Sequence, residues 1–328
     1  MKKAKKIIAL LLTLAFVATM ISCGKNQEQE HIHKIGVLVY DLKDEQVQAF
    51  REYLESYIAG NFSDVDFLYS SEVTTEEKEM EFLNNAIAEG VEGVLAFNSF
   101  DLEKEVSLCA ENGVYFIRPS STTAPEDFDK VADNPYFLGY FGPGSEMEYQ
   151  AGFDMGSYFA KEQISDSYFL LSGGAGTNVM HEQRAEGMLD ALQEVYGVQF
   201  EQSSAELASA SEPVSVEAGN LKVTVFPGYI GVPDVGQQAV AEFEKDPAGV
   251  VMSTIPVQAI ADSLGDASLG TVDCYTETNG ELFRNGNLKY LCGKYESIIG
   301  PAFAAMYNAV TGYSEDFRED GKAFAIQQ

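Results

Sequence analysis

Apolar runs that resemble buried strands alternate with amphipathic helical segments along almost the whole chain. The first run, Lys34–Tyr40, reads KIGVLVY, and such continuous apolar runs are typical of parallel strands that are buried on both faces. A helical pattern follows each run, and Asp44 and Asp101 stand where helix N-caps are expected. Strict alternation of this kind predicts an α/β protein built on open parallel sheets.

The alternation passes through two successive units. The expected strands are Lys34–Tyr40, Val65–Tyr69, Val94–Phe97 and Val114–Ile117, then Tyr136–Phe141, Ser167–Leu171, Val223–Phe226, Gly249–Met252, Gly270–Tyr275, Asn287–Leu291 and Ala323–Ile326. Capping boxes are predicted at Thr74/Glu77 and Ser145/Glu148. Residues Gln202–Gly219, rich in Ala, Ser and Glu, are expected to form a surface insertion with at most a loose helix. Because roughly 300 residues exceed one typical core, two lobes are expected.

The N-terminus has the pattern of a secretory signal. Four lysines precede the apolar stretch Ile7–Ile21, which is shorter than the about 20 residues of a permanent span. The stretch ends in Met20-Ile21-Ser22-Cys23-Gly24, which resembles the bacterial lipobox, and this resemblance implies that Cys23 is acylated and becomes the first residue. Two acyl chains would hold the chain on the outer face of the cell membrane. The alternative is an ordinary signal peptide that ends near a Cys.

Composition excludes several classes of function. The formal net charge of −30 repels phosphate backbones, so a nucleic-acid partner is not expected. No CxxC is present, which argues against a zinc site or a disulfide framework. Cys109 is expected in the core, and Cys274 and Cys292 could pair, although free thiols are favoured. His31 and His33 could bind a metal weakly, but the His31-Ile32-His33 segment is interpreted as solvated linker, so no metal is expected.

One long motif resembles a known family. Leu170–Met188 reads LLSGGAGTNVMHEQRAEGM, and its Arg184-Ala185-Glu186-Gly187 matches the Arg-x-x-Gly helix start of the type I periplasmic binding proteins, the ribose- and galactose-binding group. Asp273 takes the place of that family's strand-end Asp, and Gly293-Lys294-Tyr295 resembles its crossover between lobes. The chain is therefore expected to form two doubly wound, Rossmann-like lobes joined by a three-strand hinge.

The resemblance also implies a division of the chain. The expected parts are a signal peptide at 1–22, a polar tether at 23–33, a first lobe of 34–138 plus 295–319, and a second lobe of 139–294 plus 320–328. Crossings between the lobes are expected near Tyr136–Phe141, Gly293–Tyr295 and Phe317–Lys322.

The family's mechanism implies a binding function without a cofactor or catalysis. A small polar solute, with a sugar favoured, would bind where the strands end and would be presented by a monomer to ABC permease subunits. Two departures keep other ligands open, a nucleoside or an amino-acid-like solute: no aromatic ring follows the first strand, and Ser120-Ser121 replaces an Asp-Arg pair. A ligand sensor that feeds a membrane kinase is a further alternative. Gly174-x-Gly176 lacks the third glycine of a dinucleotide motif, so an enzyme is not expected.

Strand-end positions and the family motif nominate the ligand-binding residues. They are Tyr40, Asp41, Gln46, Ser99, Ser120, Asn178, Arg184, Thr254, Asp273 and Lys294. Each has a structural alternative. Asn178 and Asp273 could be caps, Arg184 a solvated helix residue, and Lys294 part of the hinge surface. His181 is interpreted as a surface residue.

Overall fold

The computed structural model describes residues 31–174, 178–228, 234–255, 257, 260–314, 318 and 320–327, without the side chains of Asp273, Cys274 and Gln327. The predicted signal peptide, the predicted lipid attachment residue Cys23 and most of the predicted tether lie outside the described residues. No helix in the described part is long and apolar enough to span a bilayer.

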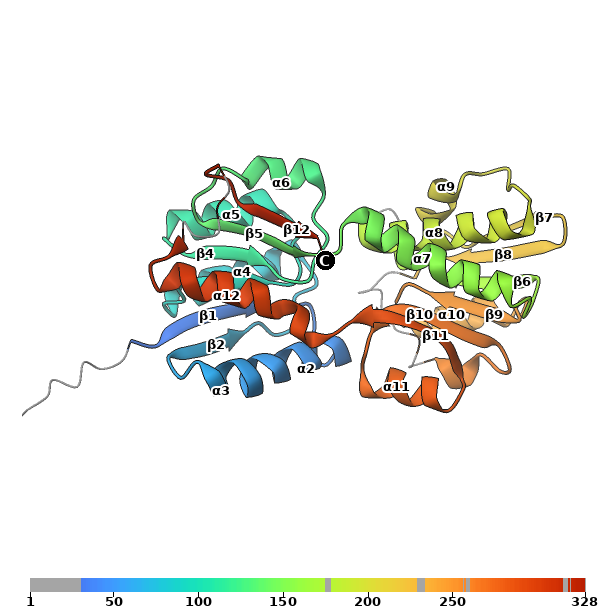
Figure 1. The fold of residues 1–328 in the computed structure, drawn as a ribbon, viewed down its shortest axis with the longest axis horizontal. Coiled ribbons are helices and arrows are strands. Elements are labelled where there is room, and N and C mark those ends of the chain that lie inside the picture. The colour runs from blue at the N-terminus through green and yellow to red at the C-terminus, as the bar shows by residue number, and fades with distance from the viewer. Residues whose placement is uncertain are drawn as a thin grey trace, which may run out of the picture. The chain divides into compact units, whose positions relative to one another are not determined.

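Two six-stranded sheets organise the described chain, one in each lobe (Figure 1). The first has the order β12-β5-β4-β3-β1-β2, with β1 His33–Leu38, β2 Val65–Tyr69, β3 Gly93–Ala96, β4 Tyr115–Arg118, β5 Phe137–Gly142 and β12 Phe324–Gln327. The second has the order β11-β10-β9-β6-β8-β7, with β6 Ser167–Leu171, β7 Val214–Ala218, β8 Leu221–Phe226, β9 Val250–Ser253, β10 Ser268–Cys274 and β11 Leu288–Lys294. Neighbouring strands are parallel except β7 and β8. The predicted α/β class is confirmed.

Helices pack on both faces of each sheet, so that each sheet has a hydrophobic core on either side. In the first lobe they are α2 Glu45–Glu52, a π-helical turn η1 Tyr53–Ile58, α3 Ala59–Asn61, α4 Glu76–Ala88, α5 Leu102–Glu111, α6 Pro125–Val131, η3 Glu296–Ile299 and α12 Gly300–Val310. In the second lobe they are α7 Ser145–Lys161, α8 Val179–Tyr196, α9 Ser204–Ala208, α10 Val235–Phe243, η2 Ala261–Ser263 and α11 Glu277–Arg284. The apolar clusters on the two faces of each sheet confirm the predicted doubly wound arrangement.

The helix starts follow local capping chemistry. Asp44 caps α2 by accepting from the backbone N–H groups of Gln46 and Val47, and Asp101 caps α5 by accepting from that of Lys104, as predicted. The Thr74/Glu77 box is wrong by one residue, because α4 begins at Glu76 and the cap is therefore Thr75.

The cysteines whose side chains are described are free thiols. Cys109 is fully buried, as expected. Cys292 is half-buried, and its register partner on β10 is Val272.

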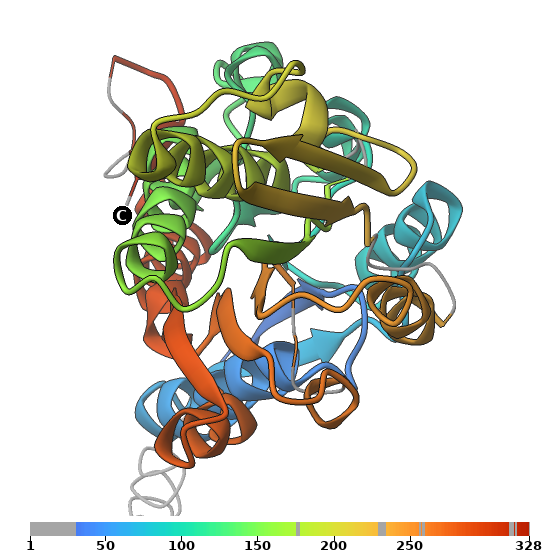
Figure 2. The same ribbon diagram turned by 90° about the vertical axis from the view of Figure 1, so that its right-hand side faces the viewer.

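Two expectations about chain organisation are wrong. Residues 202–219 are not a loose insertion: Ser203 and Glu206 form a capping box for α9, and β7 pairs antiparallel with β8 at the edge of the sheet (Figure 2). Residues 320–328 were expected in the second lobe, but β12 pairs with β5 in the first sheet. All of β5 also belongs to that sheet, so the first lobe extends past residue 138 to 142. The described residues around Phe317–Lys322 therefore carry no crossing, and crossings follow β5 and β11.

Helices α7 and α8 approach each other closely at glycines. A Cβ atom on Gly187 would lie 2.1 Å from the carbonyl oxygen of Tyr149, and one on Gly152 would lie 1.9 Å from that of Arg184. Backbone atoms cannot yield as a flexible side chain can. The contact therefore depends on glycine on both helices.

We predict that Gly187→Ala lowers the free energy of unfolding by about 2–3 kcal/mol, because the added methyl forces the two helices apart. Urea unfolding measures the loss. The control is Gly60→Ala, where nothing lies within 4 Å of the added carbon; helix propensity there favours Ala by up to about 1 kcal/mol. Equal stability of the two variants would contradict the packing argument.

Candidate functional site

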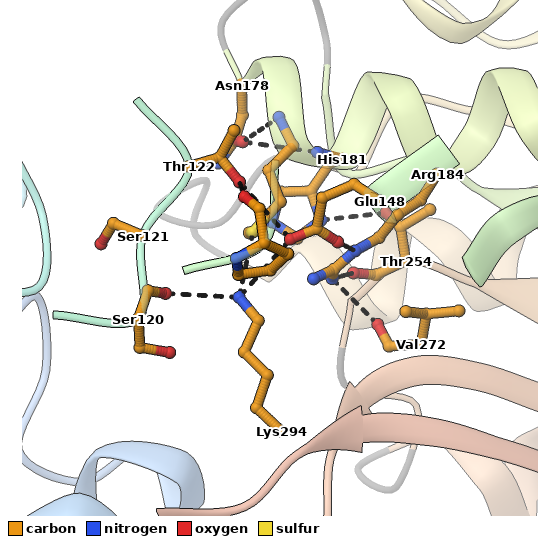
Figure 3. Close-up of polar contacts among 12 residues, drawn as sticks. Ser120, Ser121, Thr122, Glu148, Asn178, His181, Arg184, Thr254, Val272 and Lys294 are labelled. Carbon is orange, nitrogen blue, oxygen red and sulfur yellow. Dashed lines mark hydrogen bonds and ion pairs between the residues drawn. The ribbon is translucent and has the colours of Figure 1, made fainter. Parts of the chain in front are cut away.

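Polar groups from both lobes meet around the buried carboxylate of Glu148, on the first turns of α7 (Figure 3). Its Oε2 accepts from Arg184 Nε at 2.5 Å. Its Oε1 lies 3.5 Å from Lys294 Nζ and accepts from Thr122 Oγ1 at 3.4 Å. The predicted Ser145/Glu148 capping box is wrong, because α7 starts at Ser145 without a side-chain cap and the Glu148 carboxylate binds these cations instead.

Arg184 is held inside the second lobe. Only 3% of it is exposed, and its Nη1 donates to the carbonyl oxygens of Val272 at 3.0 Å and Thr254 at 3.3 Å. The Val272 carbonyl lies near the end of β10, and the Thr254 carbonyl directly follows β9. The alternative of a solvated helix arginine is therefore wrong. Its predicted role as a ligand contact stays a prediction.

Lys294 connects the two lobes. It is the last residue of β11, and its Nζ donates to the carbonyl oxygen of Ser120 at 3.3 Å, in the loop that follows β4 of the first sheet. Its side chain is 12% exposed. A second connection is made by Thr122 in the same loop, which reaches Glu148 and donates to the Pro143 carbonyl at 2.9 Å. Lys294 therefore contributes a positive charge to the interior.

The electrostatics of the cluster follow from burial and ion pairing. Burial alone would raise the pKa of Glu148, but the neighbouring Arg184 and Lys294 outweigh it and hold that pKa below its ordinary value. The Glu148 carboxylate is therefore ionised at neutral pH. It balances one of the two buried positive charges.

His181 is buried, which contradicts its expected surface position. The hydroxyl of Thr254 donates to the Ser172 carbonyl, so the 3.1 Å contact between His181 Nδ1 and Thr254 Oγ1 assigns the ring proton to Nδ1. Burial, with Arg184 nearby, lowers the pKa of His181 to about 3. The imidazole is therefore neutral at physiological pH.

The other predicted residues lie at strand ends or helix starts and make different contacts. Asn178 caps α8 by accepting from the N–H groups of Met180 and His181, as its structural alternative proposed. In the first lobe, Asp41 accepts from Lys43 N at 2.9 Å and Ser99 donates to Glu105 at 3.0 Å. Tyr40 follows β1, and Gln46 lies half-buried in the first turn of α2. Asp273 pairs through its backbone with Gly293, and its side chain lies outside the description.

The structure thus brings together part of the predicted set: Ser120, Arg184, Thr254 and Lys294 bind one another or share Glu148, with Asn178 beside them through His181. Sequence reasoning missed Glu148 and Thr122. The sequence does contain a signal that Glu148 is buried. Glu148, Gly152 and Gly156 are spaced by four residues, so they share the helix face that packs on α8.

Tyrosines line a cavity beside the β11 crossing. The cavity measures about 700 Å³ and is lined by α2, η1, residues 275–278 and Glu296. Tyr275 stacks on Tyr295 with ring centroids 4.4 Å apart, and Thr278 Oγ1 donates to Glu45 Oε1 at 2.7 Å. Tyr275 therefore places an aromatic ring in the wall of this cavity.

Comparisons with known proteins show where this architecture recurs. No protein-family model matches the chain, and no curated protein matches it by sequence. Among solved structures, the glucose-galactose binding protein GanP from Geobacillus stearothermophilus superposes with a TM-score of 0.60 at 13% identity, covering 91% of this chain and 96% of that one. The arabinose ABC transporter binding protein from Shewanella sp. ANA-3 gives 0.61 at 15%, covering 85% and 86%. A periplasmic sugar-binding protein from Legionella pneumophila gives 0.62 at 15%, covering 84% and 94%.

We predict that Glu148→Gln lowers the free energy of unfolding by about 3–5 kcal/mol at pH 7, because it leaves two buried cations without their counter-charge. Because the pKa of Glu148 is lower in the folded protein than its ordinary value of 4.5, the ionised carboxylate stabilises the fold at pH values above 4.5. This stabilisation is lost as the pH falls through the folded-state pKa. The difference between the two proteins should therefore shrink below about pH 4. Urea unfolding at pH 7 and in acid measures both effects.

The matched control is Glu146→Gln, an exposed acid in the same helical turn. It should change the free energy of unfolding by less than about 0.5 kcal/mol. A similarly small effect of Glu148→Gln would show that the buried charges are balanced in another way.

Proposed function

Because the chain has the type I periplasmic binding protein fold, we propose that it is an extracytoplasmic solute-binding lipoprotein. It captures a small polar ligand, a sugar being favoured, and presents it to the permease subunits of an ABC importer. It binds without catalysis. Acylated Cys23 ties it to the outer face of the cell membrane.

The observation that carries the proposal is the polar connection between the lobes at the ends of the strands. Lys294 of the second lobe binds a first-lobe carbonyl, and Thr122 of the first lobe binds Glu148. Such bonds can be exchanged for bonds to a ligand or to water when the lobes move, at a small net cost. A solute that touches both lobes therefore shifts the equilibrium toward the closed arrangement.

The chemistry of the strand ends favours a ligand rich in hydroxyl groups. Asp41, Gln46 and Ser99 offer carboxylate, amide and hydroxyl groups near the ends of β1 and β3. The amide and the hydroxyl both donate to and accept from ligand hydroxyls, and the carboxylate accepts from them. Aromatic rings such as Tyr275 pack on apolar faces. Three structures that share the fold are named for sugars, which supports the same class.

We expect a sugar at 100 times its dissociation constant to add about 2.7 kcal/mol of stability, seen as a rise in Tm. A thermal-shift screen of the protein against pentoses, hexoses, nucleosides, amino acids and carboxylates measures it. A rise with only nucleosides or amino acids would keep the binding function and reject the sugar.

Two variants locate the site of a positive ligand. Asp41→Asn in the first lobe and Lys294→Gln in the second should each weaken binding at least tenfold, because each removes a charged partner at a strand end. The control is Asp66→Asn, an exposed acid on β2, which should bind normally. Full affinity in both site variants would place the ligand elsewhere.

The lipid anchor has its own test. We predict that Cys23→Ala moves the protein from the membrane fraction to the soluble fraction, because no thiol remains to accept the lipid. Fractionation of expressing cells with a blot for the protein measures this. The control is Cys109→Ala, a buried cysteine far from the N-terminus, which should stay on the membrane. Retention of Cys23→Ala would contradict acylation at this residue.

A further inference from the structure

The loop between β3 and α5, residues Asn98–Asp101, rests on two carboxyl groups that are completely buried. Glu79 of α4 and Glu105 of α5 are both 0% exposed. Glu79 accepts from Asn98 Nδ2 at 2.9 Å, and Glu105 accepts from Ser99 Oγ at 3.0 Å and from Asp101 N at 2.8 Å. The loop that follows β3 is therefore fixed by hydrogen bonds to acids of two helices.

The two carboxyl groups meet at one backbone amide. Phe100 N donates to Glu79 Oε2 at 2.9 Å and to Glu105 Oε1 at 3.0 Å. Two oxygens that share one N–H lie close together, so two full negative charges there would repel each other strongly in a buried setting. A single proton between the groups removes that repulsion and adds a donor.

The surrounding charges favour one proton on the pair. Arg118 of β4 is the cation that faces both acids, Asp127 of α6 faces Arg118, and the Cys109 thiol lies near Glu105. One guanidinium balances one carboxylate, and a second ionised carboxylate would leave a net buried charge. Burial, together with Glu105, raises the pKa of Glu79 to about 9.

Unfilled hydrogen-bonding capacity is concentrated in the same cluster. Asn98 Oδ1, Glu105 Oε2 and Arg118 Nε are buried and have no hydrogen-bond partner among the described residues. Acceptors outnumber donors here if both acids are ionised. A proton on either carboxyl group turns one of that group's own oxygens from an acceptor into a donor.

We propose that Glu79 and Glu105 share one proton and act as positioning residues that fix the Asn98–Asp101 loop, and with it Ser99, at the edge of the binding site. The positioning role rests on the proposed function, since Ser99 is a ligand contact only if that function holds. The shared proton is independent of the proposed function.

The pair gives stability a defined pH dependence. Because the pKa of Glu79 is higher in the folded protein than in the unfolded chain, the proton stabilises the fold fully at pH values below the unfolded pKa, near 4.5. This stabilisation is lost as the pH rises toward the folded pKa of about 9. Between these limits the folded chain carries one proton that the unfolded chain has released. The loop should loosen when that proton leaves.

Carboxyl-carbon NMR of protein labelled at the glutamate side chains tests the shared proton without any ligand. We expect one glutamate carbon to titrate above pH 8 in the wild type, this titration to disappear in Glu79→Gln, and its midpoint to move to lower pH in Glu105→Gln, where the burial of Glu79 remains but the neighbouring acid is gone. The controls Glu77→Gln and Glu103→Gln change exposed acids on the same two helices and should keep it. Absence of any glutamate titration above pH 6 would overturn the proposal.

Two further measurements separate positioning from mere burial. The amide signals of Phe100 and Asp101 should follow the same titration in the wild type and stay fixed in Glu79→Gln, whose amide keeps the hydrogen bonds. The unfolding constant of the wild type relative to Glu79→Gln should rise about tenfold per pH unit between pH 6 and 8. Amide signals that ignore the titration would reject positioning, whereas failure of every sugar to bind would reject only the proposed function.

Discussion

The buried ion pair of Glu148 with Arg184 is the interaction on which the arrangement of the site depends. Removing two charges from water is costly, and only direct pairing and full hydrogen bonding compensate for it. Here one carboxylate serves Arg184 and Lys294, and Arg184 also satisfies two strand-end carbonyls. The same carboxylate therefore fixes how α7, α8 and three strands of the second lobe meet, and through Thr122 it also reaches the first lobe.

Local patterns were sufficient to predict most of the architecture. The expected strands include every described strand except β7. Continuous apolar runs mark central strands such as β1, β3 and β5, because a strand buried on both faces must be apolar throughout. Val214–Ala218 is not predicted as a strand, because apolar and polar residues alternate in this edge strand and the surrounding segment is rich in Ser and Glu. The partner of β12 was also missed. Its short sequence does not specify which sheet it joins, and that choice depends on the long-range pairing with β5.

The candidate site was predictable to the extent that strand ends determine it. Ser120, Thr254 and Lys294 were found because parallel strands end on one edge. The motif nominates Arg184 as well, but not its pairing with Glu148, because the two residues are 36 positions apart and no local pattern joins them. Likewise, the burial of His181 depends on Thr254, 73 residues away. Short-range spacing therefore nominates side chains, whereas the fold decides whether each one faces a ligand or another part of the protein.

The pairing of β12 with β5 covers the edge of a buried strand with a more exposed one. β5 reads FLGYFG and is buried along its whole length, with β12 as its outer neighbour in the first sheet. Without β12, an apolar strand would present a free row of N–H and C=O groups, which is a template for intermolecular β-pairing. A variant that lacks Phe324–Gln327 would expose this edge and would thus be prone to self-association.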